Sequence, residues 1–417
     1  MKKVSVVALV LVLALAFTGC TGVEQRLYKG FAKNQEITSL ESDTDVTFIL
    51  EATDFSEEEQ MMLQQAINML DNSKISMHQI SKTNKEKTVT KAYVDMDMTF
   101  GDMKMPMEAW VDMDMSKDNP EMLEIIKMPA MIMGMMSPEN PNKEYLIYDF
   151  EEMMKELPEG QEEVNNSKLM EFSKDMQTKY VDFFNNYFKE FDLGVKMAKY
   201  KGTRSANGKS LYIYEVNLDD ANFKKLIRNA VNNSLENEET IKFIEEYMSD
   251  VVNIMEIPEE EQMSKEEMKE EVKEGLDKFK EELPNIKKQF NEFMDKLEDV
   301  KVLGDKGIVI EYGMNSDGYI VHTKGNIDLA IDLEAIGKAF ETATKTEETT
   351  GVETKVQSKG KLKLGIEFNT NMYNINKDVK IEMPKTTEEN SLRMSDLMKQ
   401  QMESIEVPEA ATEAATK

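Results

Sequence analysis

The chain has 417 residues, with 80 acidic and 51 basic side chains, and a formal net charge of −29. This excess of negative charge excludes general affinity for nucleic acid, which needs clusters of Lys and Arg. Charged residues make up 31% and hydrophobic residues 40% of the chain. That balance describes a well-solvated globular protein, and the length suffices for two domains.

Residues 1–19 have the pattern of a cleaved export signal. A charged start, Met1-Lys2-Lys3, precedes an apolar run from Val4 to Phe17 that is too short to span a bilayer comfortably. The run ends in Phe17-Thr18-Gly19-Cys20, which resembles the lipobox of bacterial lipoproteins. The resemblance implies that residues 1–19 are removed, that Cys20 is lipidated, and that the protein is held on the extracytoplasmic face of a membrane.

The alternative is an ordinary secreted protein with a chance cysteine. Cys20 is the only cysteine of the chain, so it can form no internal disulfide, and its thiol needs another use. Because the chain is so acidic, we expect membrane contact to come from the lipid alone.

A β-hairpin is predicted between Ala92 and Met115. Apolar residues fall on even numbers before Gly101-Asp102 and on odd numbers after it. This is the pattern of two half-buried strands joined by a two-residue turn. One face of the hairpin then carries the candidate ligand-binding residues Met96, Met98, Phe100, Met103, Met105, Met107 and Met113.

The same register places Tyr93 opposite Trp110 on the other face, a favourable cross-strand pair. It also places Asp95 opposite Glu108, a like-charge pair that the register leaves unexplained.

The 34 methionines are the compositional anomaly, and three interpretations stay open. Methionine can simply fill core positions. Its flexible, polarizable side chain can instead line a cavity for varied apolar ligands. Thioethers can also capture copper(I), although neighbours on one strand face lie roughly 7 Å apart, so a single ion would need the facing strand as well.

The fold class predicted from these patterns is α+β: two curved, half-barrel-like antiparallel sheet units, with helices on one face and a long helical middle segment. The expected divisions are a signal peptide at 1–19, a lipidated tether and helix at 20–40, a first sheet unit at 41–150, a helical connection at 151–192, a second sheet unit at 193–390 with a helical insertion at 220–297, and a helical or disordered tail at 391–417.

Local signals refine these elements. Ser56 to Glu59 forms a capping box that opens a helix ending near Leu70. The insertion is expected to break near Pro258 and Pro284, and its charged middle is expected to be a solvated helix or, alternatively, a coiled coil that binds a partner. Alternation from Asp378 to Pro384 predicts a final strand.

An aromatic stripe at helical spacing in the helical connection is expected to pack onto a sheet. Its members are Phe172, Met176, Tyr180, Phe183, Phe184 and Phe188.

A lipid-anchored, exported chain of long antiparallel strands with helices across one face resembles the LolA/LppX-like carriers. The resemblance covers residues 40–390 as a pattern of strands. It implies a half-barrel sheet that encloses a hydrophobic cavity for acyl chains.

The sequence offers few candidate catalytic residues. The chain has two histidines, His78 and His322, and no glycine-rich phosphate loop, HExxH or GxSxG motif. We therefore expect a non-catalytic lipoprotein, with no metal and no cofactor beyond the lipid on Cys20, that binds an apolar or lipid-like ligand through the methionine face. The alternative is a structural lipoprotein that docks a partner protein through residues 220–297 and binds no small ligand.

Overall fold

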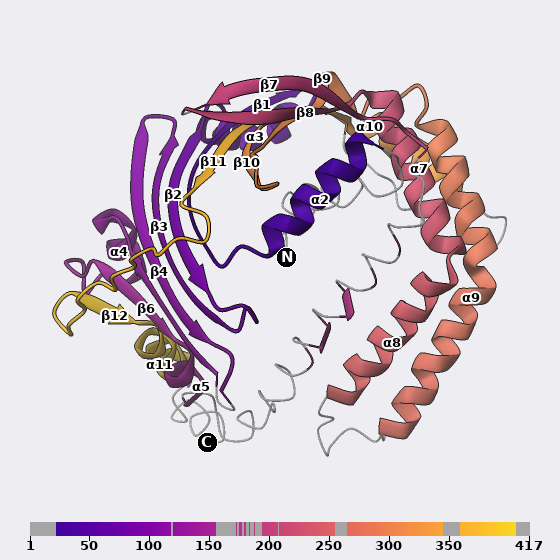
Figure 1. Cartoon of the computed structure of the whole chain (residues 1–417). Coiled ribbons are helices and arrows are strands. Elements are labelled where there is room, and N and C mark those ends of the chain that lie inside the picture. The colour runs from indigo at the N-terminus through magenta and orange to yellow at the C-terminus, as the bar shows by residue number, and fades with distance from the viewer. Residues whose placement is uncertain are drawn as a thin grey trace, which may run out of the picture.

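One open, curled sheet forms the centre of the computed structural model (Figure 1). The structure describes residues 22–117, 120–155, 194–206, 208–254, 265–344 and 359–405, with Phe172, Asp175, Met176, Lys179, Tyr180, Phe183 and Tyr187. The predicted α+β class is confirmed. The export signal at 1–19 and Cys20 lie outside the described residues.

Twelve described strands form this sheet, and all neighbours are antiparallel except the pair β12–β6. From edge to edge they are β12 (Ser391–Arg393), β6 (Tyr145–Asp149), β5 (Glu121–Lys127), β4 (Met103–Asp114), β3 (Val89–Phe100), β2 (Lys74–Thr83), β1 (Ser39–Thr53), β11 (Lys361–Tyr373), β10 (Ile320–Asp332), β9 (Leu303–Met314), β8 (Lys209–Leu218) and β7 (Ala198–Ala206).

The two sets of strands expected as separate units are joined into this one sheet by β1 and β11. Their register is continuous from Glu41 opposite Tyr373 to Thr53 opposite Lys361. The first and the last long strand of the chain are therefore neighbours at the middle of the sheet.

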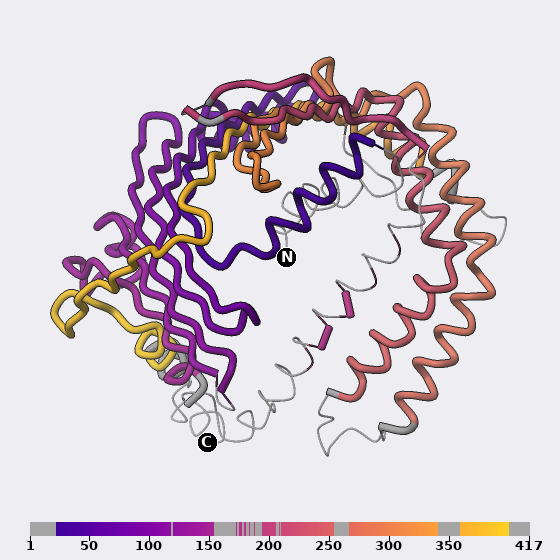
Figure 2. The backbone as a smooth tube through the Cα atoms, in the orientation of Figure 1, coloured from indigo at the N-terminus to yellow at the C-terminus, as the bar shows by residue number. Residues whose placement is uncertain are grey.

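Helices lie against the sheet or extend from one side of it (Figure 2). Their bounds are α2 (Val23–Gln35), α3 (Glu57–Leu70), α4 (Ala130–Met136), α5 (Phe150–Lys155), α7 (Asp220–Glu236), α8 (Glu238–Ile254), α9 (Lys265–Lys296), α10 (Leu333–Thr344) and α11 (Met394–Ile405). In Figure 2, α2 lies inside the curve of the sheet, and α8 and α9 run together on the side away from β12.

The predicted hairpin is confirmed in both strands and in register. Met98 lies opposite Met105 and Met96 opposite Met107, and Gly101 adopts a positive φ of 55°, which glycine accepts without steric cost.

The structure also explains the like-charge pair of this hairpin. Glu108, which lies opposite Asp95, accepts hydrogen bonds from two other side chains. Lys127 of β5 donates to one Glu108 oxygen at 2.8 Å, and the Tyr93 hydroxyl donates to the other at 3.1 Å. This hydrogen bond to Glu108 raises the pKa of Lys127, so the ammonium stays charged and offsets the repulsion.

The predicted capping box of α3 is present. The Ser56 hydroxyl accepts from the Glu59 amide at 3.3 Å, and the Glu59 carboxylate accepts from the Ser56 amide at 3.2 Å. Two amide groups that a helix start leaves unpaired are thereby satisfied.

The prediction of a strand from Asp378 to Pro384 was wrong. These residues form no ladder; instead Ile381 and Met383 pack against the cluster around Trp110 on the surface of the sheet. Their alternation reflects one side turned to that surface and one to solvent, a pattern that a strand and a single extended segment share.

The expected break at Pro284 was wrong. Helix α9 continues through Pro284, because packing along a 32-residue helix outweighs one proline. The break in this segment lies instead at Asn237, which separates α7 from α8 and caps α8 by accepting from the Thr240 amide at 3.0 Å. The aromatic stripe packs against the sheet core through Phe183, and it packs on helix α8 as well.

In that stripe, Phe172 contacts Tyr247 of α8, and Phe183 stacks on Phe243 of α8 with ring centroids 4.6 Å apart. Phe184 and Phe188, like the expected break at Pro258, lie outside the described residues.

The largest core lies between α2 and the strands β7 to β11. Leu27 of α2 is fully buried there with Val216, Ile310 and Ile327, and Phe31 meets Tyr312 edge-on at 5.2 Å. Each such aliphatic side chain contributes roughly 1.5–3 kcal/mol on burial, so α2 fixes this half of the sheet.

A glycine substitution tests how closely β8 and β9 approach each other. Gly307, within β9, has φ 59°, and a Cβ there would collide with the carbonyl oxygen of Leu218. We expect Gly307→Ala to lower the free energy of unfolding by about 1–2 kcal/mol for the left-handed backbone and about 1–3 kcal/mol more for the collision. Urea unfolding followed by circular dichroism measures the loss.

Gly318 is the matched control, because its φ is 88° and nothing lies within 4 Å of its would-be Cβ. Gly318→Ala should show only the backbone cost. Equal losses in the two variants would contradict the close approach of β9 to the end of β8.

Candidate functional site

Methionine side chains line up across the strands β2, β3 and β4. The register forms two neighbouring cross-strand rows, one of Val46, Ile75, Met98 and Met105 and one of Thr44, Met77, Met96 and Met107. Residues opposite one another on antiparallel strands have Cβ atoms about 4.5–5.5 Å apart, so the rows form a continuous thioether surface.

This surface belongs to the same sheet face that α2 covers. Val46 and Phe48 of β1 pack against the α2 core, and Val46 is the β1 member of the first row. Figure 1 shows the sheet curling around α2, so we call this side the concave face and the opposite side the convex face.

Burial divides the concave face into a closed and an open half. Under α2, Val216, Ile310 and Ile327 are at most 1% exposed. On β2 to β4 the side chains of both rows are only half-buried, and Met103 at the end of β4 is 45% exposed. The open half is an apolar surface that the described helices do not close.

The convex face of the same strands is covered around one aromatic cluster. Trp110 is 7% exposed, packed with Ile125 and Ile147 beneath the segment that carries Ile381 and Met383. Next to it, burial and the Glu108 hydrogen bond raise the pKa of Tyr93 to about 12, so the phenol stays protonated. Behind the methionine rows the convex face is polar and exposed, as at Asp95 and Asp97. The apolar surface of this part of the sheet therefore lies on the concave side.

The open half also has a boundary at the β6 edge. Leu146 of β6, which lies on the concave face by register, is fully buried with Met133 of α4 and Leu392 of β12. The accessible surface is therefore confined between α2 on one side and α4 with α11 on the other.

Of the predicted site residues, the structure brings four together in the centre: Met96, Met98, Met105 and Met107. Phe100 and Met103 pair at the turn of the hairpin, at the edge of the surface. Met113 lies near the opposite end of β4, paired with Met122 of β5, away from the central four.

Sequence reasoning missed Ile75 and Met77 as part of the site. Both lie on β2, directly opposite Met98 and Met96. The alternation of β2 was visible, but its neighbour in the sheet was not, so no signal placed these side chains beside the hairpin.

Other clusters on the described chain do not favour a reaction. Both histidines lie in one convex cross-strand row with Asp43 and Asn371. His78 Nδ1 is 2.8 Å from an Asp43 oxygen, and His322 Nδ1 is 2.8 Å from the Asn371 side-chain oxygen. Within the described residues, no group of three or more His, Cys, Asp or Glu is placed to hold a metal ion.

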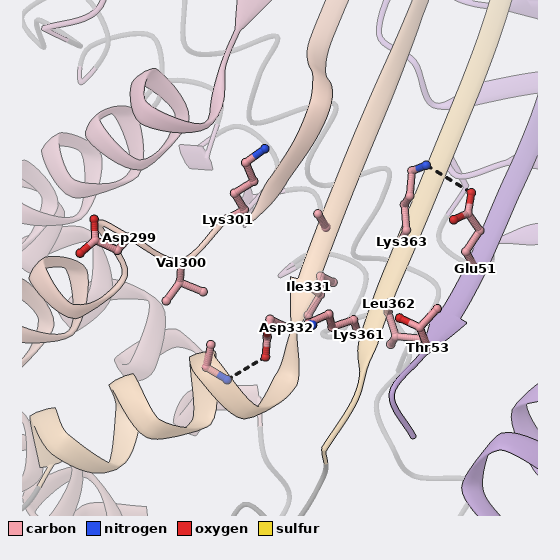
Figure 3. A pocket seen from close by; sticks show the side chains of 12 residues that line it. Glu51, Thr53, Asp299, Val300, Lys301, Ile331, Asp332, Lys361, Leu362 and Lys363 are labelled. Carbon is pink, nitrogen blue, oxygen red and sulfur yellow. Dashed lines mark hydrogen bonds and ion pairs between the residues drawn. The ribbon is translucent and has the colours of Figure 1, made fainter. Parts of the chain in front are cut away.

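A cavity of about 420 Å³ lies at the ends of β1, β10 and β11 (Figure 3). Its three lysines already face carboxylates: Lys363 with Glu51 at 3.2 Å, Lys361 with Asp54 at 2.8 Å, and Lys301 with Asp305 at 2.8 Å. With its positive charge balanced in this way, the cavity has no surplus for an anion.

No known family model matches this chain, and no curated protein matches it. Among the described residues, no helix has both the length and the apolar character needed to cross a membrane.

The open surface predicts binding of an apolar probe. Met96→Gln with Met98→Gln keeps side-chain length but adds amides to the surface, so the affinity for Nile red should fall. Fluorescence titration measures the affinity, and urea unfolding checks that both variants are folded.

The matched control is Met131→Gln with Met135→Gln on α4, whose methionines are 47% and 73% exposed and lie outside the two rows. These changes should leave Nile red binding unaltered. An equal loss in both pairs would mean that the dye binds exposed methionines wherever they occur.

Proposed function

We propose that this protein is an extracytoplasmic, membrane-anchored lipoprotein without catalytic activity that binds or carries an apolar or lipid-like ligand. The observation that carries the proposal is the open half of the concave face. Its methionine rows are half-buried, whereas the other half of the same face is closed by α2. An apolar half that the described helices leave open supports a binding surface on that side.

Methionine suits such a ligand for a physical reason. Its side chain is unbranched and polarizable, so a row of thioethers adapts to ligands of different shape. Each CH₂ group of an acyl chain that leaves water contributes about 0.8 kcal/mol, so even partial burial of a long chain gives useful affinity. No cofactor is needed for this role.

Anchoring through Cys20 is part of the same proposal. The support is the charged start, the apolar run and the Thr-Gly-Cys ending of residues 1–20. One acyl chain holds a protein only weakly, and two or more anchor it stably. A lipid-anchored carrier would receive its ligand at the membrane surface.

The second candidate is a structural lipoprotein that docks a partner protein through α7, α8 and α9. It is favoured by Tyr247 and Met248 of α8, which are 42% and 36% exposed. It requires no small ligand, and it would leave the methionine rows as an incompletely covered core.

Native mass spectrometry of protein lacking residues 1–20, purified from a bacterial host, separates the two. The carrier predicts a co-purified acyl species in stoichiometric amount, identified after lipid extraction. A clean mass that stays unchanged after incubation with lipids and with copper(I) would contradict the carrier and favour the partner-docking protein.

The role of sulfur is tested in the same measurement with Met→Leu changes at positions 96, 98, 105 and 107. Leucine nearly conserves volume, and such swaps usually cost less than about 1.5 kcal/mol. Retention of an acyl ligand should persist in this variant. Loss of ligand without loss of stability would instead assign the binding to thioether chemistry, as copper(I) capture requires.

A further inference from the structure

Helix α3 exposes an apolar surface that the fold leaves uncovered. Met61 is 75%, Met62 67%, Met69 50% and Leu70 40% exposed, and the helix buries none of its residues. Amphipathic helices of globular proteins normally turn their apolar side to the core, so this helix departs from the usual pattern.

Most of the exposed apolar residues share one side of the helix, whereas Met61 lies about 100° around the axis from Met62, among Glu58, Gln64 and Gln65. Met62, Ala66 and Met69 follow the i, i+4, i+7 spacing of a single helical face, and all three are exposed. Leu63 and Ile67 are half-buried and form the neighbouring face. The apolar arc of α3 is therefore wider than its contact with the protein.

The β3–β4 turn extends this surface. A Cβ on Gly101 would lie 3.5 Å from the carbonyl oxygen of Asn68 in the last turn of α3, and Met103 follows that turn with 45% of its surface exposed. We call Met62, Met69, Leu70 and Met103 the α3 patch. Contiguous apolar surface of this kind marks an interaction site.

The α3 patch lies at one end of the sheet. Thr53, the last residue of β1, is opposite Lys361, which is also opposite Asp332 at the end of β10. The Leu333 amide that opens α10 donates to the Gly360 carbonyl at 3.0 Å. Helices α3 and α10 therefore both leave from this end.

The N-terminal end of α2 points to the same end of the sheet. Its last turn is held at the opposite end, where Asn34 exchanges two hydrogen bonds with the backbone of Ile320 at 2.9 and 3.0 Å. From there α2 runs toward α10 (Figure 1). Gly22, where the chain leaves the described structure, follows Cys20 by only two positions.

We infer that the α3 patch contacts the surface of the membrane that holds Cys20. The occupant is argued from the short tether, because two residues between the anchor and α2 keep the α3 end of the sheet close to the bilayer. This choice of occupant rests on the anchoring proposed above. Since Glu57, Glu58 and Glu59 occupy the first turn of α3, the contact is apolar and requires a neutral lipid surface rather than an anionic one.

The contact orients the ligand surface. Phe100 and Met103 form the end of the hairpin beside α3. Met98 and Met105 form the neighbouring pair on the same face of the sheet. With the α3 patch on the bilayer, the open half of the concave face begins at the membrane and leads away from it. An acyl chain leaving the bilayer would then enter along the methionine rows.

The test tethers the protein to a lipid vesicle through an artificial tag in place of the proposed lipid on Cys20. Every described helix and strand begins at Val23 or later, so a hexahistidine tag replaces residues 1–20 and removes the only cysteine. The tagged chain is tethered to phosphatidylcholine vesicles that contain a nickel-chelating lipid. An NBD fluorophore is attached at Met62→Cys or, as control, at Met135→Cys, because Met62 is 67% and Met135 73% exposed.

We expect a blue shift of NBD emission and strong quenching by doxyl-labelled lipid at position 62, with neither at position 135. No change at position 62, or the same change at both positions, overturns the contact. A blue shift at position 62 that rises with protein concentration in the absence of vesicles overturns it in favour of a second copy of this chain. Because the tether is artificial, a failure here leaves the proposed lipidation and ligand binding separately testable.

Discussion

The pairing of β1 with β11 is the constraint on which the rest of the structure depends. It joins the first strand of the chain to the last long one in a continuous register, from Glu41 opposite Tyr373 to Thr53 opposite Lys361. Without it the strands β2 to β6 and the strands β7 to β10 would be two sheets with exposed inner edges. With it they share one concave face, so α2 can close one half while the other half stays open. Contacts of such sequence separation form slowly, because loop-closure entropy must be overcome before they form.

Local features of the fold were predictable because their causes are local. The capping box at Ser56 and the hairpin about Gly101 depend on residues a few positions apart, and both are present in the register predicted. The four central methionines of the candidate site were found for the same reason. Alternation within one hairpin is enough to place Met96, Met98, Met105 and Met107 on one face.

Non-local features were not predictable from one sequence. Nothing in the local pattern shows that β1 lies between β2 and β11, because this depends on strand order. The segment at Ile381 alternates like a strand but packs as a single extended layer on Trp110. The stripe at Phe183 was expected to meet a sheet, and it packs against the sheet core but also stacks on Phe243 of α8, since a helical apolar face does not specify all its partners.

Other segments of the chain cover many apolar side chains of the sheet but leave the methionine surface partly open to solvent. The chain uses Ile381 and Met383 to cover the aromatic side of β3 and β4, and α2 to cover the concave side of β7 to β11. The α2 cover ends at Val46, and the methionines of the two rows stay half-buried beyond it. Apolar side chains left half-exposed on a rigid sheet cost free energy in water, and a ligand that removes them from water recovers it.

The central claim is that an apolar ligand lies on these rows, and methyl NMR of protein carrying ¹³C-labelled methionine methyl groups tests it most directly. A doxyl-labelled lysophospholipid is added, and methyl resonances are assigned by Met→Leu variants. The account predicts selective broadening at Met77, Met96, Met98, Met105 and Met107, with Met131 and Met135 of α4 unaffected. Broadening that is absent from the five, or that follows exposure alone and is greatest at Met135, would contradict it.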